Sequence, residues 1–178
     1  MKEIPKHLGG HANITHLDEK VLDFFIRRPI FSFLDIGCGP GGMVELAKQY
    51  GLDARGIDGD INCANEDIII HDYTKGPLEL DVNFDLGWSV EFLEHVESKY
   101  LNNIFATFMC CSVILMTHAL PGMGGYHHVN CQESNYWIDE FEKRNFLLDL
   151  DLTKYIRSIS GMRRNFIRNT GMVFINPR

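Results

Sequence analysis

A glycine-rich loop constrains the fold of this 178-residue chain more than any other feature. The apolar run at residues 31–36 predicts a buried strand, the loop follows it at once, and a helix is predicted over residues 43–50. Gly37, Gly39 and Gly42 match the pattern G-x-G-x-x-G, in which glycine permits a tight turn and lets a ligand approach the backbone. Strand, turn and helix together predict an α/β fold with a ligand site at the loop.

Strands and helices alternate along the rest of the chain. Further strands are predicted at 54–57, 67–71, 84–90, 110–117, 146–152 and 172–175, with helices at 18–28, 98–108 and 134–143. Thr15 and Asp18 resemble a capping box at the first helix, and Ser134 is expected to cap the last. The alternation predicts a doubly wound parallel sheet with helices on both faces. One domain is expected over residues 1–178, with an N-terminal loop and helix over 1–30 and a core over 31–178.

Composition excludes several classes of protein. No run of about 18 apolar residues occurs, which excludes a membrane span, and the polar N-terminus does not resemble a signal peptide. The five cysteines show neither metal-ligand spacing nor a disulfide framework, so a reducing, cytoplasmic compartment is expected. The net charge of -7 argues against general affinity for nucleic acid. Residues 154–178 nevertheless sum to +6 and the remainder to -13, so this tail either binds an anion or docks on the acidic body.

Two acids indicate which cofactor the loop would hold. Asp58 lies 21 residues after Gly37, at the end of the second predicted strand, where an acid accepts hydrogen bonds from ribose hydroxyls. Asp35 precedes Gly37 by two residues, and a carboxylate there repels the pyrophosphate of a dinucleotide. It attracts instead the amino and sulfonium groups of S-adenosylmethionine. The two acids therefore favour an adenosine cofactor that carries positive charge and no phosphate.

The loop and the segments after it resemble motifs of the class I S-adenosylmethionine-dependent methyltransferases. Leu34–Gly41 is similar to the first motif, Gly56–Asp60 to the second and Phe84–Glu91 to the fourth, and the opening Gly-Gly-His segment resembles small, phage-like members. The resemblance spans residues 30–178 and implies a Rossmann-like, seven-stranded, mostly parallel sheet with one antiparallel strand. It implies a set of cofactor-binding residues on these motifs and after the third strand: Asp35, Gly37, Cys38, Gly39, Asp58, Gly59, Asp72, Tyr73, Trp88 and Ser89. Asp72 takes the place of an acid near the adenine amino group, and His11, with His7, is expected to fold over the cofactor.

Acceptor chemistry is expected from two polar clusters at the carboxyl edge of the sheet. Transfer to oxygen or nitrogen needs a base or a metal to take the acceptor proton. The candidates are Glu91, Glu94 and His95 after the fourth predicted strand, and His127 and His128 after the fifth. The three residues after the fourth strand and one of the two histidines are expected to converge in one pocket, where such crowding requires a divalent metal, a cationic acceptor or a shared proton.

The same cluster raises the question of a metal. Glu91-x-x-Glu94-His95 resembles the segment with which small-RNA terminal 2′-O-methyltransferases bind a divalent metal, and ubiquinone-pathway O-methyltransferases carry a similar stretch. The resemblance implies a site for Mg²⁺, Mn²⁺ or Zn²⁺ on Glu91, Glu94, His95 and His128. The alternative is the edge of a substrate pocket without metal.

The acceptor itself is left open by the sequence. His118, Tyr136, Arg163 and Arg164 are candidates for substrate binding, and the arginines suit an anionic acceptor. The leading interpretation is methyl transfer to oxygen or nitrogen of a small molecule, because little of the chain is left to grip a large one. The alternatives are metal-dependent 2′-O-methylation of an RNA terminus, an NAD-dependent oxidoreductase and a non-catalytic binding module. Asp35 and the lack of a Tyr-x-x-x-Lys pair weigh against the oxidoreductase.

Overall fold

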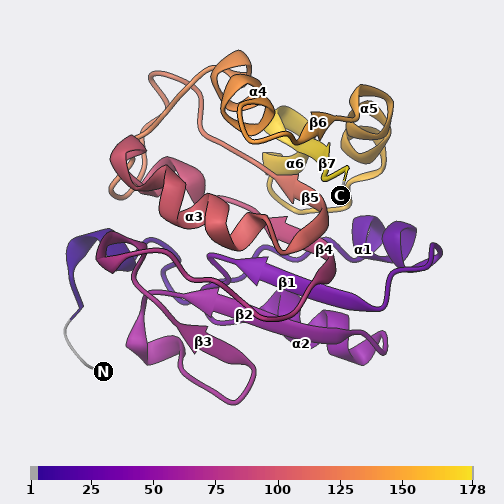
Figure 1. Cartoon of the computed structure of the whole chain (residues 1–178), viewed down its shortest axis with the longest axis horizontal. Coiled ribbons are helices and arrows are strands. Elements are labelled where there is room, and N and C mark those ends of the chain that lie inside the picture. The colour runs from indigo at the N-terminus through magenta and orange to yellow at the C-terminus, as the bar shows by residue number, and fades with distance from the viewer. Residues whose placement is uncertain (1–3, 178) are drawn as a thin grey trace.

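A seven-stranded sheet forms the centre of the computed structural model, which describes residues 4–177 (Figure 1). Its strands are β1 (Ser32–Ile36), β2 (Asp53–Asp58), β3 (Ile68–Ile70), β4 (Phe84–Ser89), β5 (Cys111–Met116), β6 (Leu147–Leu148) and β7 (Met172–Ile175). They follow the order β3-β2-β1-β4-β5-β7-β6. The pairs among β1 to β5 are parallel, and β7 runs antiparallel to both of its neighbours. The predicted mostly parallel sheet with one antiparallel strand is confirmed.

Helices cover both faces of the sheet, as the alternating pattern predicts. They are α1 (Glu19–Ile26), α2 (Gly42–Gln49), α3 (Leu101–Phe108), α4 (Ser134–Glu142), α5 (Leu150–Ile159) and α6 (Phe166–Thr170). Apolar side chains of α1, α2, α5 and α6 pack in one cluster on one face, and those of α3 and α4 pack in a second cluster on the other. No helix within residues 4–177 has the length and apolarity needed to cross a membrane.

Two predicted helix caps are wrong. Asp18 caps α1 by accepting a hydrogen bond from the Val21 N–H, whereas the Thr15 hydroxyl oxygen accepts from the N–H of Gly42 at the start of α2. Ser134 is the first residue of α4 rather than its cap, and its hydroxyl bonds to a ring nitrogen of His118. In both cases a tertiary contact takes the hydroxyl that the local pattern assigned to the helix.

The C-terminal part departs furthest from the prediction. The strand predicted over 146–152 is limited to Leu147–Leu148, because Asp149 accepts from the Leu152 N–H and starts α5. Helices α5 and α6 were not predicted. Two of the basic residues bond within this part: Arg157 donates to the carbonyl of Gly171, and Arg168 donates to carbonyls of the 160–162 turn. Arg178 lies outside the described residues.

The carboxyl ends of the parallel strands meet at one edge of the sheet, where open α/β sheets bind ligands. The glycine loop, the turn after β4 and the loop after β5 all leave the sheet there. The N-terminal segment, with the 3₁₀ helix η1 (Lys6–Leu8), lies beside the arrowheads of β1 and β2 (Figure 1). Segments far apart in the sequence thereby surround one edge.

Candidate active site

The glycine loop is fixed to the end of β2 by Asp58. One carboxylate oxygen, Oδ2, accepts the N–H of Gly39 at 2.7 Å, and Oδ1 accepts the N–H of Asp60 at 2.8 Å. Gly37 and Gly39 have φ values of 80° and 52°, in the left-handed region that favours glycine. Burial raises the pKa of Asp58 above its usual value. The predicted ribose acid therefore lies against the loop, where the spacing puts it.

An acidic cavity of about 260 Å³ opens beside the loop. Asp35, Asp58 and Glu91 line it, and no lysine or arginine of residues 4–177 does. Asp35 is only 4% exposed, and burial together with the charge of Asp58 holds its pKa well above the usual range. A cationic ligand would stabilise the ionised form of these acids, whereas that form would repel a phosphate.

A second cavity, also of about 260 Å³, adjoins the first, and Asp58 and Gly59 line both. Asp72 and Tyr73 line it. Asp72 accepts the N–H of Thr74 at 2.9 Å, and the Tyr73 hydroxyl donates to Thr107 in the core. The residues predicted for ribose and adenine thus border two adjoining cavities, and their roles stay predictions.

Three other predicted cofactor residues occupy different positions. Trp88 lines the first cavity. Ser89 is fully buried and its hydroxyl donates to the carbonyl of Ile36, which ties β4 to β1. Cys38 also lines the first cavity, and burial raises the pKa of its thiol far above the usual value, so it stays protonated. Ser89 therefore supports the loop through the backbone.

Glu91 follows β4 in a strained conformation. Its φ of 56° is unfavourable for a side chain of this size, and such strain concentrates at functional sites. Its N–H donates to the Thr117 hydroxyl oxygen at 2.8 Å, and that hydroxyl donates to Glu91 Oε1 at 3.2 Å. Burial raises the pKa of Glu91 to about 7. Thr117 was missed from the sequence, although it ends the fifth predicted strand at the expected edge.

Glu94, His95 and His128 converge, but Glu91, which was predicted to complete the metal ligands, is not part of this group. One potential ligand atom from each lies within 4.8 Å of the others. Glu94 is fully buried, and neither of its carboxylate oxygens has a hydrogen-bond partner in the described chain; the same holds for Nδ1 of His95. Burial and the charge of Glu91 raise the pKa of Glu94 well above its usual value, and burial followed by His128 lowers that of His95 to about 4. The cluster therefore holds buried polar atoms that a bound cation would satisfy, or, for the Glu94 carboxyl, a proton shared with the Glu91 carboxyl.

The loop after β5 brings His128 to this cluster. The N–H groups of Val129 and Asn130 both donate to the carbonyl of Glu94, at 2.9 and 3.0 Å. The ring of His128 fills the space in which Gly125 would carry a side chain. His127 has a φ of 49° and lines the second cavity, whereas His128 lines the first. The two neighbouring histidines therefore serve different cavities.

The four residues predicted for substrate binding line neither cavity: His118, Tyr136, Arg163 and Arg164. His118 is 1% exposed, packs beside Trp137 and bonds to Ser134, which is a core position. Their substrate role stays a prediction without a contact that supports it. Tyr126 and Phe166, which were not predicted, line the first cavity.

Comparison with known proteins identifies the fold. No protein-family model and no curated protein matches the sequence. Among solved structures, the PH0226 protein from Pyrococcus horikoshii OT3 is similar at 16% identity and a TM-score of 0.59, over 90% of this chain and 87% of that one. The plantazolicin methyltransferase BpumL in complex with SAH is similar at 14% and 0.60, over 89% and 80%. The small RNA methyltransferase HEN1 is similar at 13% and 0.59, over 90% of this chain and 25% of that one. The chain has the fold of the class I S-adenosylmethionine-dependent methyltransferases, as its glycine-loop motif predicts.

Proposed function

We propose that this protein transfers the methyl group of S-adenosylmethionine to an oxygen or nitrogen atom of a small acceptor. The observation that carries the proposal is the first cavity, in which three carboxylic acids face a glycine loop without a lysine or arginine. S-adenosylmethionine has an ammonium and a sulfonium group and no phosphate, so carboxylates lower its free energy when it is bound. The same carboxylates would repel the pyrophosphate of NAD. BpumL, which has the same fold, was crystallised with SAH.

The two cavities suggest how the cofactor lies. Asp72 borders the cavity suited to adenine, Asp58 lines both cavities and would meet the ribose, and Asp35 lines the first cavity and would meet the amino group. The sulfonium then lies near Glu91. In this arrangement each acid interacts with a group of the cofactor that is positively charged or donates a hydrogen bond.

Glu91 is the proposed base. Without a bound cation, its pKa of about 7 matches the ordinary working pH, and a group with such a pKa accepts a proton efficiently. As the acceptor atom attacks, its bond to the methyl carbon forms, the carbon–sulfur bond breaks, and the acceptor proton passes to Glu91. The products are the methylated acceptor and S-adenosylhomocysteine (SAH). A cavity of about 260 Å³ with walls from Trp88, Tyr126 and Phe166 suits a small acceptor with an apolar body.

Thermal unfolding with SAH or NAD⁺ tests the cofactor. At 100 times its Kd a ligand stabilises the native state by about 2.7 kcal/mol, which raises the Tm of a chain of this size by roughly 5–10 °C. SAH should produce this rise and NAD⁺ should not. The variant Asp58→Ala loses a charged hydrogen bond to the ribose, so its Kd for SAH should increase about 10- to 150-fold. A rise with NAD⁺ and none with SAH would make the proposal wrong.

A cation at Glu94, His95 and His128 is a second element of the proposal. The unpartnered carboxylate oxygens of Glu94 and the unpartnered Nδ1 of His95 fit this assignment, because buried polar atoms normally have partners. Carboxylate and imidazole together suit Mn²⁺, Mg²⁺ or Zn²⁺. When bound, such an ion would polarise an acceptor hydroxyl and favour its deprotonation. An RNA terminus is the less favoured acceptor, because no lysine or arginine of the described chain lines the first cavity to meet a phosphate.

Calorimetry with Mn²⁺ in two buffers of different ionisation enthalpy tests the cation. Wild type should bind one ion and release protons, since the buried carboxyls must ionise. Glu94→Gln removes a ligand with little change of shape, so affinity should fall at least about 10-fold. Asp23→Asn, at an exposed ion pair with Arg27, is the matched control and should bind as wild type does. Equal binding by wild type and Glu94→Gln would contradict the site.

A further inference from the structure

Residues 6–15, here called the lid, cross the sheet edge above the junction of the two cavities. Leu8 fills the space in which Gly59 would carry a side chain, and a side chain on Gly39 would meet Cβ of His11 at 2.9 Å. His7 and Leu8 line both cavities. The lid therefore packs directly on the two glycines that border the proposed ribose position.

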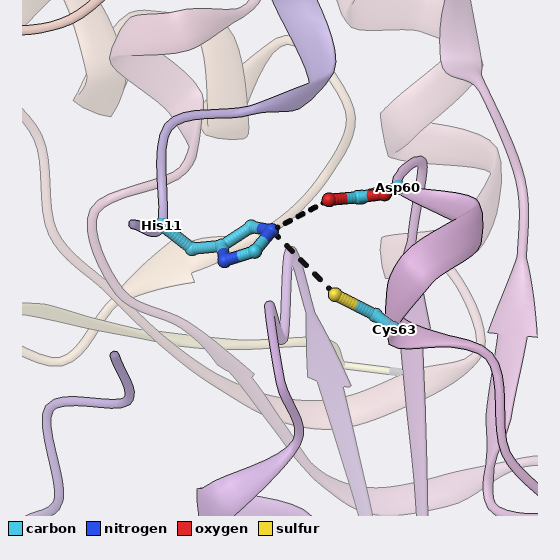
Figure 2. Close-up of side chains that lie close together, drawn as sticks. All are labelled: His11, Asp60 and Cys63. Carbon is cyan, nitrogen blue, oxygen red and sulfur yellow. Dashed lines mark hydrogen bonds and ion pairs between the residues drawn. The ribbon is translucent and has the colours of Figure 1, made fainter. Parts of the chain in front are cut away.

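One histidine of the lid forms the cluster in Figure 2. Nε2 of His11 lies 3.1 Å from Oδ2 of Asp60 and 3.5 Å from Sγ of Cys63, a spacing that also suits three ligands of a metal. The backbone N–H of Asn13, however, donates to Nδ1 of the same ring at 2.9 Å. Nδ1 then bears no proton, so in the neutral ring Nε2 bears it and donates to Asp60. This pattern favours a hydrogen bond from His11 to Asp60 over a metal site. We call such a hydrogen bond between the lid and the sheet edge a clasp.

A second clasp lies at the other end of the lid. The ring of His7 donates from Nε2 to Oδ2 of Asp72 at 3.2 Å. Asp72 is the residue proposed above to meet the adenine amino group. Both histidines are more than two-thirds buried. Burial raises the pKa values of Asp60 and Asp72, but hydrogen bonds from Asn62 and Thr74, followed by those from His11 and His7, outweigh it and lower both values. Each clasp therefore joins the lid to a carboxylate at the carboxyl edge of the sheet.

The base of the lid is strained. Ala12 and Asn13 both have positive φ values, 47° and 56°, and alanine rarely adopts such a conformation. Beyond them, the hydroxyl oxygen of Thr15 accepts the N–H of Gly42 and anchors the lid at the start of α2. A strained turn between an anchor and two clasps has the properties of a hinge that opens when the clasps break.

We propose that the lid gates cofactor exchange: it is held shut by the His7–Asp72 and His11–Asp60 hydrogen bonds, and it swings open about Ala12 and Asn13. This inference rests on the proposed function for the identity of the cofactor. When a site is accessible only in the open state, the observed association rate is the intrinsic rate multiplied by the open fraction. Breaking the clasps therefore accelerates association as well as dissociation, whereas removal of ordinary wall contacts accelerates dissociation alone.

Stopped-flow binding of SAH to wild type and to His7→Ala/His11→Ala tests the gate. Loss of two hydrogen bonds to carboxylates should raise the open fraction, and with it the association rate constant, about 10-fold or more. Asp23→Asn should bind at the wild-type rate. An unchanged association rate with faster dissociation would overturn the gate and make both histidines simple wall residues.

Hydrogen exchange without ligand separates this inference from the proposed function. The Leu8 amide donates to the carbonyl of Pro5, just before the lid, and the Ile14 amide donates to the carbonyl of His11 within it. The Gly42 amide donates to Thr15 at the anchor of the lid. In the double variant the Leu8 and Ile14 amides should exchange about 10-fold faster, while core amides of β4 should not change. If wild type binds no SAH, the proposed function is wrong. Independently of that result, unchanged exchange of the Leu8 and Ile14 amides in the double variant would show that the two hydrogen bonds do not hold the lid closed.

Discussion

Glu91 combines a strained backbone with a raised pKa, and both properties can be measured. Its folded-state pKa of about 7 exceeds the ordinary 4.5, so the native state favours the protonated form. The stability that comes from this preference is present below pH 4.5 and is lost as pH rises through 7. Glu91→Gln imitates the protonated acid, so above pH 7 the variant should be more stable than wild type by up to about 3 kcal/mol. Denaturant unfolding at pH 4.5 and pH 8.5, with a chelator present, should show equal stability at the lower pH and a difference at the higher one.

The same substitution separates stability from catalysis. Loss of a general base slows a reaction by about 10²- to 10⁴-fold. Glu91→Gln should therefore be a more stable and far less active protein once an acceptor is known. A variant that is neither stabilised at pH 8.5 nor slowed would contradict both the buried position and the role as base.

Single residues were predictable where a motif fixes their spacing. Asp35 lies in β1 two residues before the first glycine of the loop, and Asp58 is the last residue of the neighbouring strand β2, so both lie beside the loop. Thr117 could not be found this way, because its contact with Glu91 depends on the register of β5 against β4. His118, one residue further on, turns into the core, so strand-end position alone does not decide which side chain faces a cavity.

At the level of elements, local patterns predicted the strands well and the C-terminal helices badly. The run Phe146–Leu148 is apolar enough for a strand, and the continuation to Leu152 alternates in the same way. Asp149 ends the strand because its side chain caps α5. This cap is hard to recognise in the sequence because the residues around Asp149 are mostly apolar. The shared sheet edge and the resemblance to a metal-binding segment predicted that His127 or His128 would approach Glu94. The conformation of the loop after β5 decides that His128 is the one that does.

A pair of glycines in that loop tests whether it positions His128. An added methyl group on Gly125 collides with the His128 ring, whereas one on Gly124 meets open space. Gly125→Ala should displace the ring and reduce Mn²⁺ affinity at least about 10-fold, and Gly124→Ala should not change it. Calorimetry measures both. Equal affinity in the two variants would exclude His128 from the cation site.

Across the whole molecule, stability and the site are expected to be separable. The alternating pattern predicted helices on both faces of one sheet, and the candidate site lies at the strand ends, away from the aromatic centre of the second apolar cluster. There Phe141 of α4 stacks on Phe174 of β7, with ring centroids 3.9 Å apart and planes 7° from parallel. Both are fully buried. Phe141→Ala leaves a cavity that the rigid sheet cannot close, which costs about 3–5 kcal/mol and lowers the Tm by roughly 6–20 °C.

Phe141→Leu keeps most of the volume, so a folded variant is available even if the alanine variant unfolds. Phe141 lines neither cavity, so the Kd of Phe141→Leu for SAH, measured well below its Tm, should stay within about two-fold of wild type, a difference of only 0.4 kcal/mol. A much weaker Kd in a variant with native circular dichroism would show that packing between α4 and β7 reaches the strand ends. The positions of the lid and of the loop after β5 would then depend on packing in the core, and ligand affinity would be set by more than the contacts at the sheet edge.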